Sequence, residues 1–194
     1  MRRALPCLAL FAVLLPFCRV GIAQETAAKV AKDAKEPDVV YVPTPHDVVL
    51  KMLAIAQVEK KDVLYDLGCG DGRIMVMAAK KFGCRAIGFD VDPQRVRETR
   101  QNIEKNKVQR LVEVRQEDVF KLDLSPASVV TMYLLPALNV RLIPQLEKLK
   151  PGSRIVTHDF DIEGYRPDRA IEITSNEDNV EHRVYLFTTP LKKE

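Results

Sequence analysis

Short apolar runs alternate with longer amphipathic stretches from residue 62 to the end of the chain. Apolar runs of about four to eight residues are typical of buried strands, and apolar residues spaced three and four apart are typical of helices. We expect helices at 74–82, 93–107 and 137–149, and an earlier helix that Thr44 caps and Pro45 opens. We expect strands at 63–67, 85–90, 111–115, 128–134, 154–158, 170–174 and 184–188.

This alternation predicts an α/β fold. Strands that alternate with helices form a mostly parallel sheet with helices on both faces, here a Rossmann-like sheet of seven strands. A short polar turn over 175–179 joins the last two strands, so we expect an antiparallel hairpin at the C-terminal end. The domain is expected to span residues 41–194, after a linker over 24–40 that is rich in Ala, Lys, Glu and Asp.

The first residues have the three-part pattern of a secretory signal. Arg2 and Arg3 precede an apolar stretch over 4–17, and Gly21 and Ala23 are the small residues that a signal peptidase reads. We therefore expect a signal peptide over 1–23 and an exported domain, periplasmic or secreted. The alternative is an uncleaved N-terminal anchor, and membrane contact is expected only through this segment.

Removing the leader changes the charge of the chain. The chain has 30 Lys and Arg residues against 27 Asp and Glu, and the leader carries three arginines and no acid, so the remaining chain is formally neutral. No basic surface of the kind that nucleic acid requires is predicted. Two of the four cysteines also lie in the leader, and no Cys/His spacing predicts a metal site.

The strongest chemical motif is D-L-G-C-G-D-G-R over 66–73, between a predicted strand and a predicted helix. Glycines allow a tight turn and close approach of a ligand to the backbone, here at Gly68, Gly70 and Gly72. A dinucleotide loop would have glycine where this chain has Arg73, which disfavours a nicotinamide-dependent oxidoreductase. The carboxylate of Asp66 would repel a diphosphate but attract an ammonium group.

Two further acids follow the next two predicted strands. Asp90 ends the second strand, where an acid can accept hydrogen bonds from both hydroxyls of a ribose. Asp118 follows the third strand, where it could bond an adenine amino group or simply cap a helix. S-adenosylmethionine (SAM) has an ammonium, a ribose and an adenine, which match Asp66, Asp90 and Asp118 in order.

These motifs together resemble the SAM-binding series of the class I methyltransferases, over residues 41 to the C-terminus. Finer features resemble the small protein-lysine methyltransferases related to those of the ATP synthase c-subunit and the adenine nucleotide carrier, namely Y-V-P-T at 41–44, L-P at 135–136, H-D-F at 158–160 and G-Y-R-P at 164–167. The resemblance implies SAM as cofactor and a protein lysine as methyl acceptor. An export leader departs from the usual intracellular enzyme, because SAM is made in the cytosol.

The acceptor side is less defined than the SAM side. The fourth strand reads T-M-Y-L-L-P over 131–136 and lacks the Asp or Asn followed by two prolines that is typical of DNA-adenine and glutamine enzymes. Tyr133 and His158 are the catalytic candidates, each with a structural alternative, and Thr44 is expected near the reacting end. His46 and His182 are expected to be surface or capping residues.

Two alternatives to lysine methylation remain open on the sequence. One is a small-molecule methyltransferase, because the fold does not fix the acceptor. The other is an exported module that kept the fold and lost catalysis.

Overall fold

The computed structural model describes residues 41–194, and the predicted signal peptide and linker lie outside the described residues. The helices are α2 (His46–Ile55), α3 (Arg73–Phe82), α4 (Pro93–Lys105), α5 (Pro136–Leu146) and the short 3-10 helix η1 (Val119–Lys121). The strands are β1 (Val63–Leu67), β2 (Arg85–Asp90), β3 (Val112–Gln116), β4 (Val129–Met132), β5 (Arg154–His158), β6 (Arg169–Thr174) and β7 (Glu181–Thr188).

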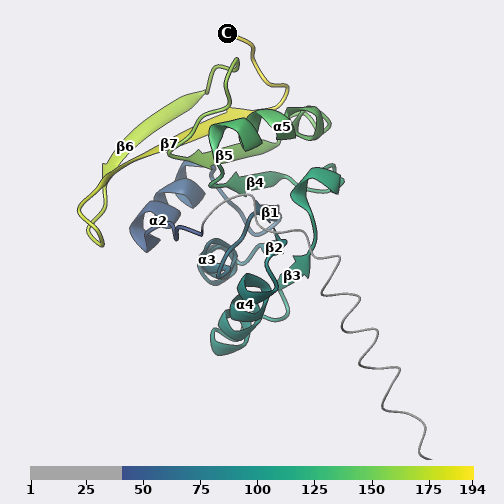
Figure 1. Cartoon of the computed structure of the whole chain (residues 1–194), viewed down its shortest axis with the longest axis vertical. Coiled ribbons are helices and arrows are strands. Elements are labelled where there is room, and N and C mark those ends of the chain that lie inside the picture. The colour runs from purple at the N-terminus through teal and green to yellow at the C-terminus, as the bar shows by residue number, and fades with distance from the viewer. Residues whose placement is uncertain (1–40) are drawn as a thin grey trace, which may run out of the picture. The chain divides into compact units, whose positions relative to one another are not determined.

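The strands form one seven-stranded sheet in the order β3-β2-β1-β4-β5-β7-β6 (Figure 1). The first five strands of that order pair in parallel, and β7 pairs antiparallel with both β5 and β6. The predicted fold class, with its antiparallel C-terminal hairpin, is confirmed. The chain order reverses at β1, which lies between β2 and β4, and open α/β sheets bind ligands at such a reversal.

Each face of the sheet has its own apolar core. Residues of α2, α3 and α4 pack with one set of strand residues, including Leu64 and Ala86. Residues of α5 and η1 pack with the alternate set, including Tyr65 and Ile87. This alternation is what a strand buried on both faces requires. Within residues 41–194, no helix combines the length and the apolar character needed to cross a bilayer.

The start of α2 differs from the prediction. Pro45 occupies the position before the helix and no side chain caps it, so the predicted cap at Thr44 is wrong. Thr44 is 4% exposed, and its hydroxyl lies 3.0 Å from Nδ1 of His158. The Thr44 hydroxyl therefore contacts a residue distant in the sequence and does not cap the helix.

A largely buried ion pair joins the starts of β1, β4 and β5. Asp62 is 3% exposed, pairs with Arg154 at the start of β5, and accepts a hydrogen bond of 2.8 Å from the Ser128 hydroxyl. Its second oxygen accepts the backbone N–H of Glu59 at 2.7 Å. Removing one partner of such a pair leaves the other charge without compensation, and this is usually strongly destabilising.

We expect Asp62→Ala to lower the free energy of unfolding by about 2–3 kcal/mol, because it removes the carboxylate partner of the Arg154 guanidinium and of the Glu59 amide. Urea and thermal unfolding would measure the change. Lys61→Ala is the matched control, since Lys61 and its partner Glu59 are 81% and 58% exposed and such pairs contribute about 0–1 kcal/mol. Equal stability of the two variants would contradict this account of the Asp62 anchor.

Candidate active site

A cleft of about 1000 Å³, counted with its open mouth, lies where β1, β2 and β4 end. The residues that follow these strands line it, together with the segment before α2 and the loop before η1. The carboxyl ends of parallel strands at a reversal of strand order are where α/β folds bind ligands. The lining includes Thr44, Asp66, Gly68, Asp90, Asp118 and Tyr133.

The glycine loop fits together by close packing. The amides of Gly68 and Cys69 both donate to the carbonyl of Phe89, at 2.9 and 3.0 Å, which fixes the loop against the end of β2. Gly68 lines the cleft, whereas Gly70 and Gly72 are not among its lining residues. A Cβ at Gly70 would lie 2.1 Å from the ring of Tyr41, and one at Gly72 would lie 2.6 Å from Thr99. These two glycines therefore allow close packing of the loop, at Gly70 against the cleft-lining Tyr41 and at Gly72 against Thr99 of α4.

Residues 41–44 form a roof over one side of the cleft. Nη1 of Arg73 donates to the carbonyl of Thr44 at 2.9 Å, and Arg73 is paired with Asp71 at 2.7 Å. The guanidinium of Arg95 lies 4.6 Å from the centre of the Tyr41 ring, a cation–π arrangement. Sequence reasoning missed the contacts of Arg73 with Thr44 and of Arg95 with Tyr41, because no spacing rule connects residues 41–44 with residues 73 and 95.

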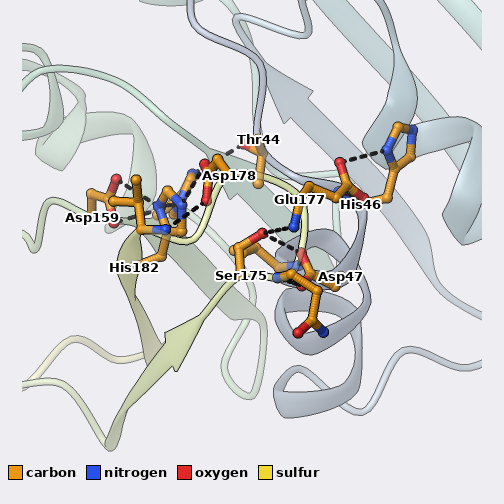
Figure 2. A network of polar contacts seen from close by, with 12 residues as sticks. Thr44, His46, Asp47, Asp159, Ser175, Glu177, Asp178 and His182 are labelled. Atoms are coloured by element: carbon orange, nitrogen blue, oxygen red, sulfur yellow. Dashed lines mark hydrogen bonds and ion pairs between the residues drawn. The ribbon is translucent and has the colours of Figure 1, made fainter.

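The roof is also fixed by the far end of the chain. Asp47 accepts the Ser175 hydroxyl at 2.9 Å and the amide of Asn176 at 2.8 Å. Glu177 accepts the amide of His46 at 2.9 Å. Figure 2 shows Asp47 and His46 facing Ser175 and Glu177 of the turn between β6 and β7. The C-terminal hairpin therefore docks on the start of α2, directly after the roof.

Asp66 is a buried carboxylate at the end of β1. It is 2% exposed, and its Oδ1 accepts a hydrogen bond of 2.7 Å from the hydroxyl of Thr131. Its Oδ2 is buried and has no hydrogen-bond partner among the described residues. Burial raises the pKa of Asp66 to about 7, because a charged group without a counter-charge is costly in the interior. A cation in the cleft would supply that counter-charge.

Asp90 and Asp118 are oriented by backbone amides. Asp90 accepts the amides of Gly70 and Asp92, both at 2.9 Å, one on each carboxylate oxygen. Burial raises the pKa of Asp90. Asp118 accepts the amide of Phe120 at 3.1 Å and caps η1, and it also lines the cleft. Asp118 therefore caps η1 and faces the cleft at the same time.

Tyr133 and His158 lie next to each other, but only Tyr133 lines the cleft. Their ring centres are 4.0 Å apart, and the Tyr133 hydroxyl donates to Oδ2 of Asp159 at 3.0 Å. Burial and then Asp159 raise the pKa of Tyr133 to about 12, so the phenol keeps its proton near neutral pH. His158 is fully buried, and burial lowers its pKa to about 4. Its Nδ1 faces the hydroxyl of Thr44, which does line the cleft.

His182 is not the surface residue that the sequence predicted. It is 7% exposed, and its Nδ1 lies 3.0 Å from Nε2 of His158. His46, in contrast, is exposed and pairs with Glu177, as expected. Position 182 lies early in β7 and pairs with Ile173 of β6, so the alternation of the strand turns it inward. The strand begins three residues earlier than the prediction, which hid this alternation.

The chain is similar to proteins of a known enzyme family. The ANTKMT methyltransferase domain matches residues 66–169, more than half of the chain. A protein-lysine N-methyltransferase of Saccharolobus islandicus is 48% identical over 153 residues, which cover 78% of this chain and 94% of the relative. This chain belongs to the ANTKMT methyltransferase family.

Two other relatives add to this result. The crystal structure of an RNA methyltransferase from Salinibacter ruber, in complex with S-adenosyl-L-homocysteine, is 47% identical, with a TM-score of 0.72. The match covers 77% of this chain and 94% of that one. The human lysine N-methyltransferase named for the ATP synthase c-subunit is 31% identical over 121 residues, which cover 62% of this chain and half of the relative.

The chain is therefore a SAM-dependent methyltransferase of class I fold, and SAM is its cofactor. The expected resemblance is confirmed, and the oxidoreductase alternative is excluded. The residues present also fit this cofactor. SAM carries a sulfonium and an ammonium group, and the cleft offers the unpartnered Oδ2 of Asp66 beside the carboxylates of Asp90 and Asp118.

We expect SAM affinity to rise as the pH increases from about 5.5 to 7. Asp66 in the free protein ionises near pH 7, and a cationic ligand binds its ionised form, so affinity should change by up to about tenfold per pH unit below that value. Calorimetric titration of the methyltransferase with SAM would measure this dependence.

Asp66→Asn is the matched control for this titration. The amide keeps the size of the side chain and an oxygen for Thr131, but it cannot ionise. The variant should bind SAM more weakly at pH 7, with little pH dependence. A variant that retained the wild-type slope would assign the titration to another group.

Proposed function

We propose that this methyltransferase transfers the methyl group of SAM to the ε-amino group of a lysine in a protein. The relative from Saccharolobus islandicus and the human relative are both named lysine N-methyltransferases. The relative from Salinibacter ruber, of similar identity to the first, is named an RNA methyltransferase. The relatives therefore support two acceptors, and the chemistry of the cleft has to decide between them.

The charge of the cleft is the observation that carries the proposal. Its lining contains five aspartates against two arginines, namely Asp66, Asp71, Asp90, Asp92, Asp118, Arg73 and Arg95. Both arginines are engaged by acids, since Arg73 pairs with Asp71 at 2.7 Å and Arg95 pairs with Glu98 at 2.7 Å. The residues that line the cleft therefore offer no unpaired basic side chain to a phosphate backbone, which proteins contact mainly with arginine and lysine.

One end of the cleft is proposed to bind SAM, and the other is proposed to hold the methyl acceptor. We assign Asp66, Gly68, Asp90 and Asp118 to SAM, with Gly70 and Gly72 shaping the loop. We assign Thr44 and Tyr133 to the reacting end.

The reacting end also has an apolar wall. Val42, Leu134 and Leu138 line the cleft, and along the chain each lies within five residues of Thr44 or Tyr133. Apolar surroundings favour the neutral amine of lysine over the ammonium, and only the neutral amine has a lone pair that can attack.

Alignment supplies much of the expected acceleration. The sulfonium of bound SAM provides an already activated methyl group. The residues of this chain then have to hold the amine in line with it, and such positioning can contribute about 7–11 kcal/mol to a reaction barrier. We propose that the Tyr133 hydroxyl, which donates to Asp159 at 3.0 Å, accepts a hydrogen bond from the amine.

The test is methyl transfer from labelled SAM to separated pools of protein, RNA and small metabolites from the source cells. We expect label in protein, on lysine by mass spectrometry of digested bands. Asp90→Ala is the control, and it should bind SAM about 1.5–3 kcal/mol more weakly through loss of charged hydrogen bonds. Label confined to RNA or to metabolites would overturn the lysine assignment and leave the enzyme class intact.

The leader forms a second part of the proposal. We propose that residues 1–23 direct export and are removed, on the basis of the arginines, the apolar stretch and the small residues before Gln24. N-terminal sequencing of the protein purified from its source should then begin at Gln24. A protein that keeps Met1 or Arg2 in the membrane fraction would support the uncleaved anchor in its place.

A further inference from the structure

A line of side chains in hydrogen-bond contact runs from the cleft to the protein surface. The hydroxyl of Thr44 lies 3.0 Å from Nδ1 of His158, and Nε2 of His158 lies 3.0 Å from Nδ1 of His182. Nε2 of His182 lies 3.1 Å from Oδ2 of Asp178. The exposed fraction of the side chains rises outward, from 0% at His158 through 9% at His182 to 40% at Asp178.

The donors and acceptors of this line have one consistent direction. Asp178 is an acceptor, so Nε2 of His182 carries a proton and Nδ1 of His182 accepts. Nε2 of His158 then donates to His182, and Nδ1 of His158 accepts the hydroxyl of Thr44. In these tautomers each ring nitrogen has a complementary partner along the line, while Oδ2 of Asp159, 3.3 Å from Nδ1 of His182, faces a nitrogen without a proton. A proton gained at Thr44 can be matched by one lost at Asp178.

Asp159 lies beside the centre of the line. Its carboxylate oxygens are 3.4 Å from Nε2 of His158 and 3.3 Å from Nδ1 of His182. The Tyr133 hydroxyl and the amide of Arg183 each donate to Asp159 at 3.0 Å, which fixes its orientation. A fixed negative charge at this position stabilises an imidazolium that forms transiently on either ring.

We propose that Thr44, His158, His182 and Asp178 form a relay that carries the proton of the acceptor lysine from the cleft to solvent. This inference rests on the proposed lysine methylation, and it assigns a task to residues beyond the reacting pair. His158, His182 and Asp178 are positioning residues for proton exit, because none of them lines the cleft.

The reaction needs such an exit for one proton per methyl group. A lysine enters as an ammonium ion and has to lose one proton before its lone pair forms the new N–C bond, while the C–S bond breaks and its electron pair stays on sulfur. The released proton joins the Thr44 oxygen as the Thr44 hydrogen passes to Nδ1 of His158. The Nε2 hydrogen of His158 passes to Nδ1 of His182, and the Nε2 hydrogen of His182 passes to Asp178 and then to water.

The two histidines have different proton affinities. Burial lowers the pKa of His158 to about 4. Burial alone would also lower the pKa of His182, but its contacts with Asp178 and Asp159 outweigh this effect and raise it. A proton that reaches His158 is therefore drawn outward to His182.

A pH dependence follows from the surroundings of His182. The titratable groups there are His158 and Asp159 at the end of β5, Asp178 in the turn, and Tyr133 after β4 through Asp159. The relay accepts a proton only while His182 is neutral. The rate should therefore rise with pH through the raised pKa of His182.

A metal site is the competing interpretation of the same cluster. His158, Asp159 and His182 present ligand atoms that all lie within 4.8 Å of one another, and two histidines with one carboxylate can bind a transition metal. We favour the relay because the 3.0 Å separation of Nε2 of His158 from Nδ1 of His182 is a hydrogen-bond distance and because the line continues to the exposed Asp178. The metal remains an outcome of the test.

The decisive variant is Asp178→Asn in the full chain. The asparagine keeps the oxygen that accepts the amide of Val180 at 2.9 Å, but it cannot take up a proton from His182. We expect the single-turnover rate at saturating SAM and acceptor to fall by at least about tenfold at pH 7, a modest loss for a proton-transfer group. The loss should close above about pH 10, where lysine releases its proton to solvent directly.

Glu177→Gln is the matched control. It removes the same charge from the same turn and keeps an oxygen for the amide of His46, so the turn stays docked. We expect wild-type rates and wild-type SAM affinity in this variant. Equal rates for Asp178→Asn and Glu177→Gln at pH 7, or a loss in Asp178→Asn that persists unchanged at high pH, would overturn the relay and leave lysine methylation standing.

Two measurements keep the relay testable even if no lysine is methylated. Long-range ¹H–¹⁵N NMR spectra recorded at a pH above the pKa of His182 should show His158 and His182 both protonated on Nε2. A proton on Nδ1 of His158 would block transfer from Thr44 and overturn the proposal. Stoichiometric zinc or another transition metal in the purified protein, lost in His182→Gln, would also overturn it in favour of a metal site.

Discussion

Asp66 is placed at the reversal of strand order with one carboxylate oxygen bonded to Thr131 and the other buried without a partner among the described residues. Such an arrangement costs folding free energy in the absence of a counter-ion, because charge is poorly solvated in the interior. The neighbouring groups supply no counter-charge to Asp66. Asp90 is held by two backbone amides, and the nearby arginines Arg73 and Arg95 are paired with other acids. Asp66 therefore favours a ligand that carries a positive charge.

Local patterns were enough to predict the sheet, the cofactor and several of the residues that line the cleft. The run from Val63 to Leu67, the glycines after it and the acid at Asp90 lie in continuous strand–loop–helix units, where spacing along the chain fixes spacing in three dimensions. The same reasoning gave the C-terminal hairpin, since a short polar turn allows only antiparallel neighbours. The cofactor class followed because the carboxylate of Asp66 disfavours a diphosphate and favours a cationic ligand, and because Arg73 stands where a dinucleotide loop has glycine.

The acceptor side could not be predicted in this way, because its contacts join distant segments. Thr44 has the residue type and position of a helix cap, but its hydroxyl faces His158, which is 114 positions away. His182 gave no signal of burial, since the start of β7 was set three residues too late and its inward register was lost. The roof contacts from Arg73 and Arg95 depend on how the helices lie on the sheet. Each of these errors concerns a polar side chain whose partner is chosen by tertiary structure.

The docking of the β6–β7 turn on the start of α2 has a consequence for how the protein matures. The roof of the cleft comes from the first residues of the domain, yet Asp47 and His46 beside it are bound by Ser175, Asn176 and Glu177 near its end. A nascent chain that has not yet produced the hairpin lacks the partners that fix the roof. The full set of contacts beside the roof is thus formed only after the hairpin has been synthesised and has docked.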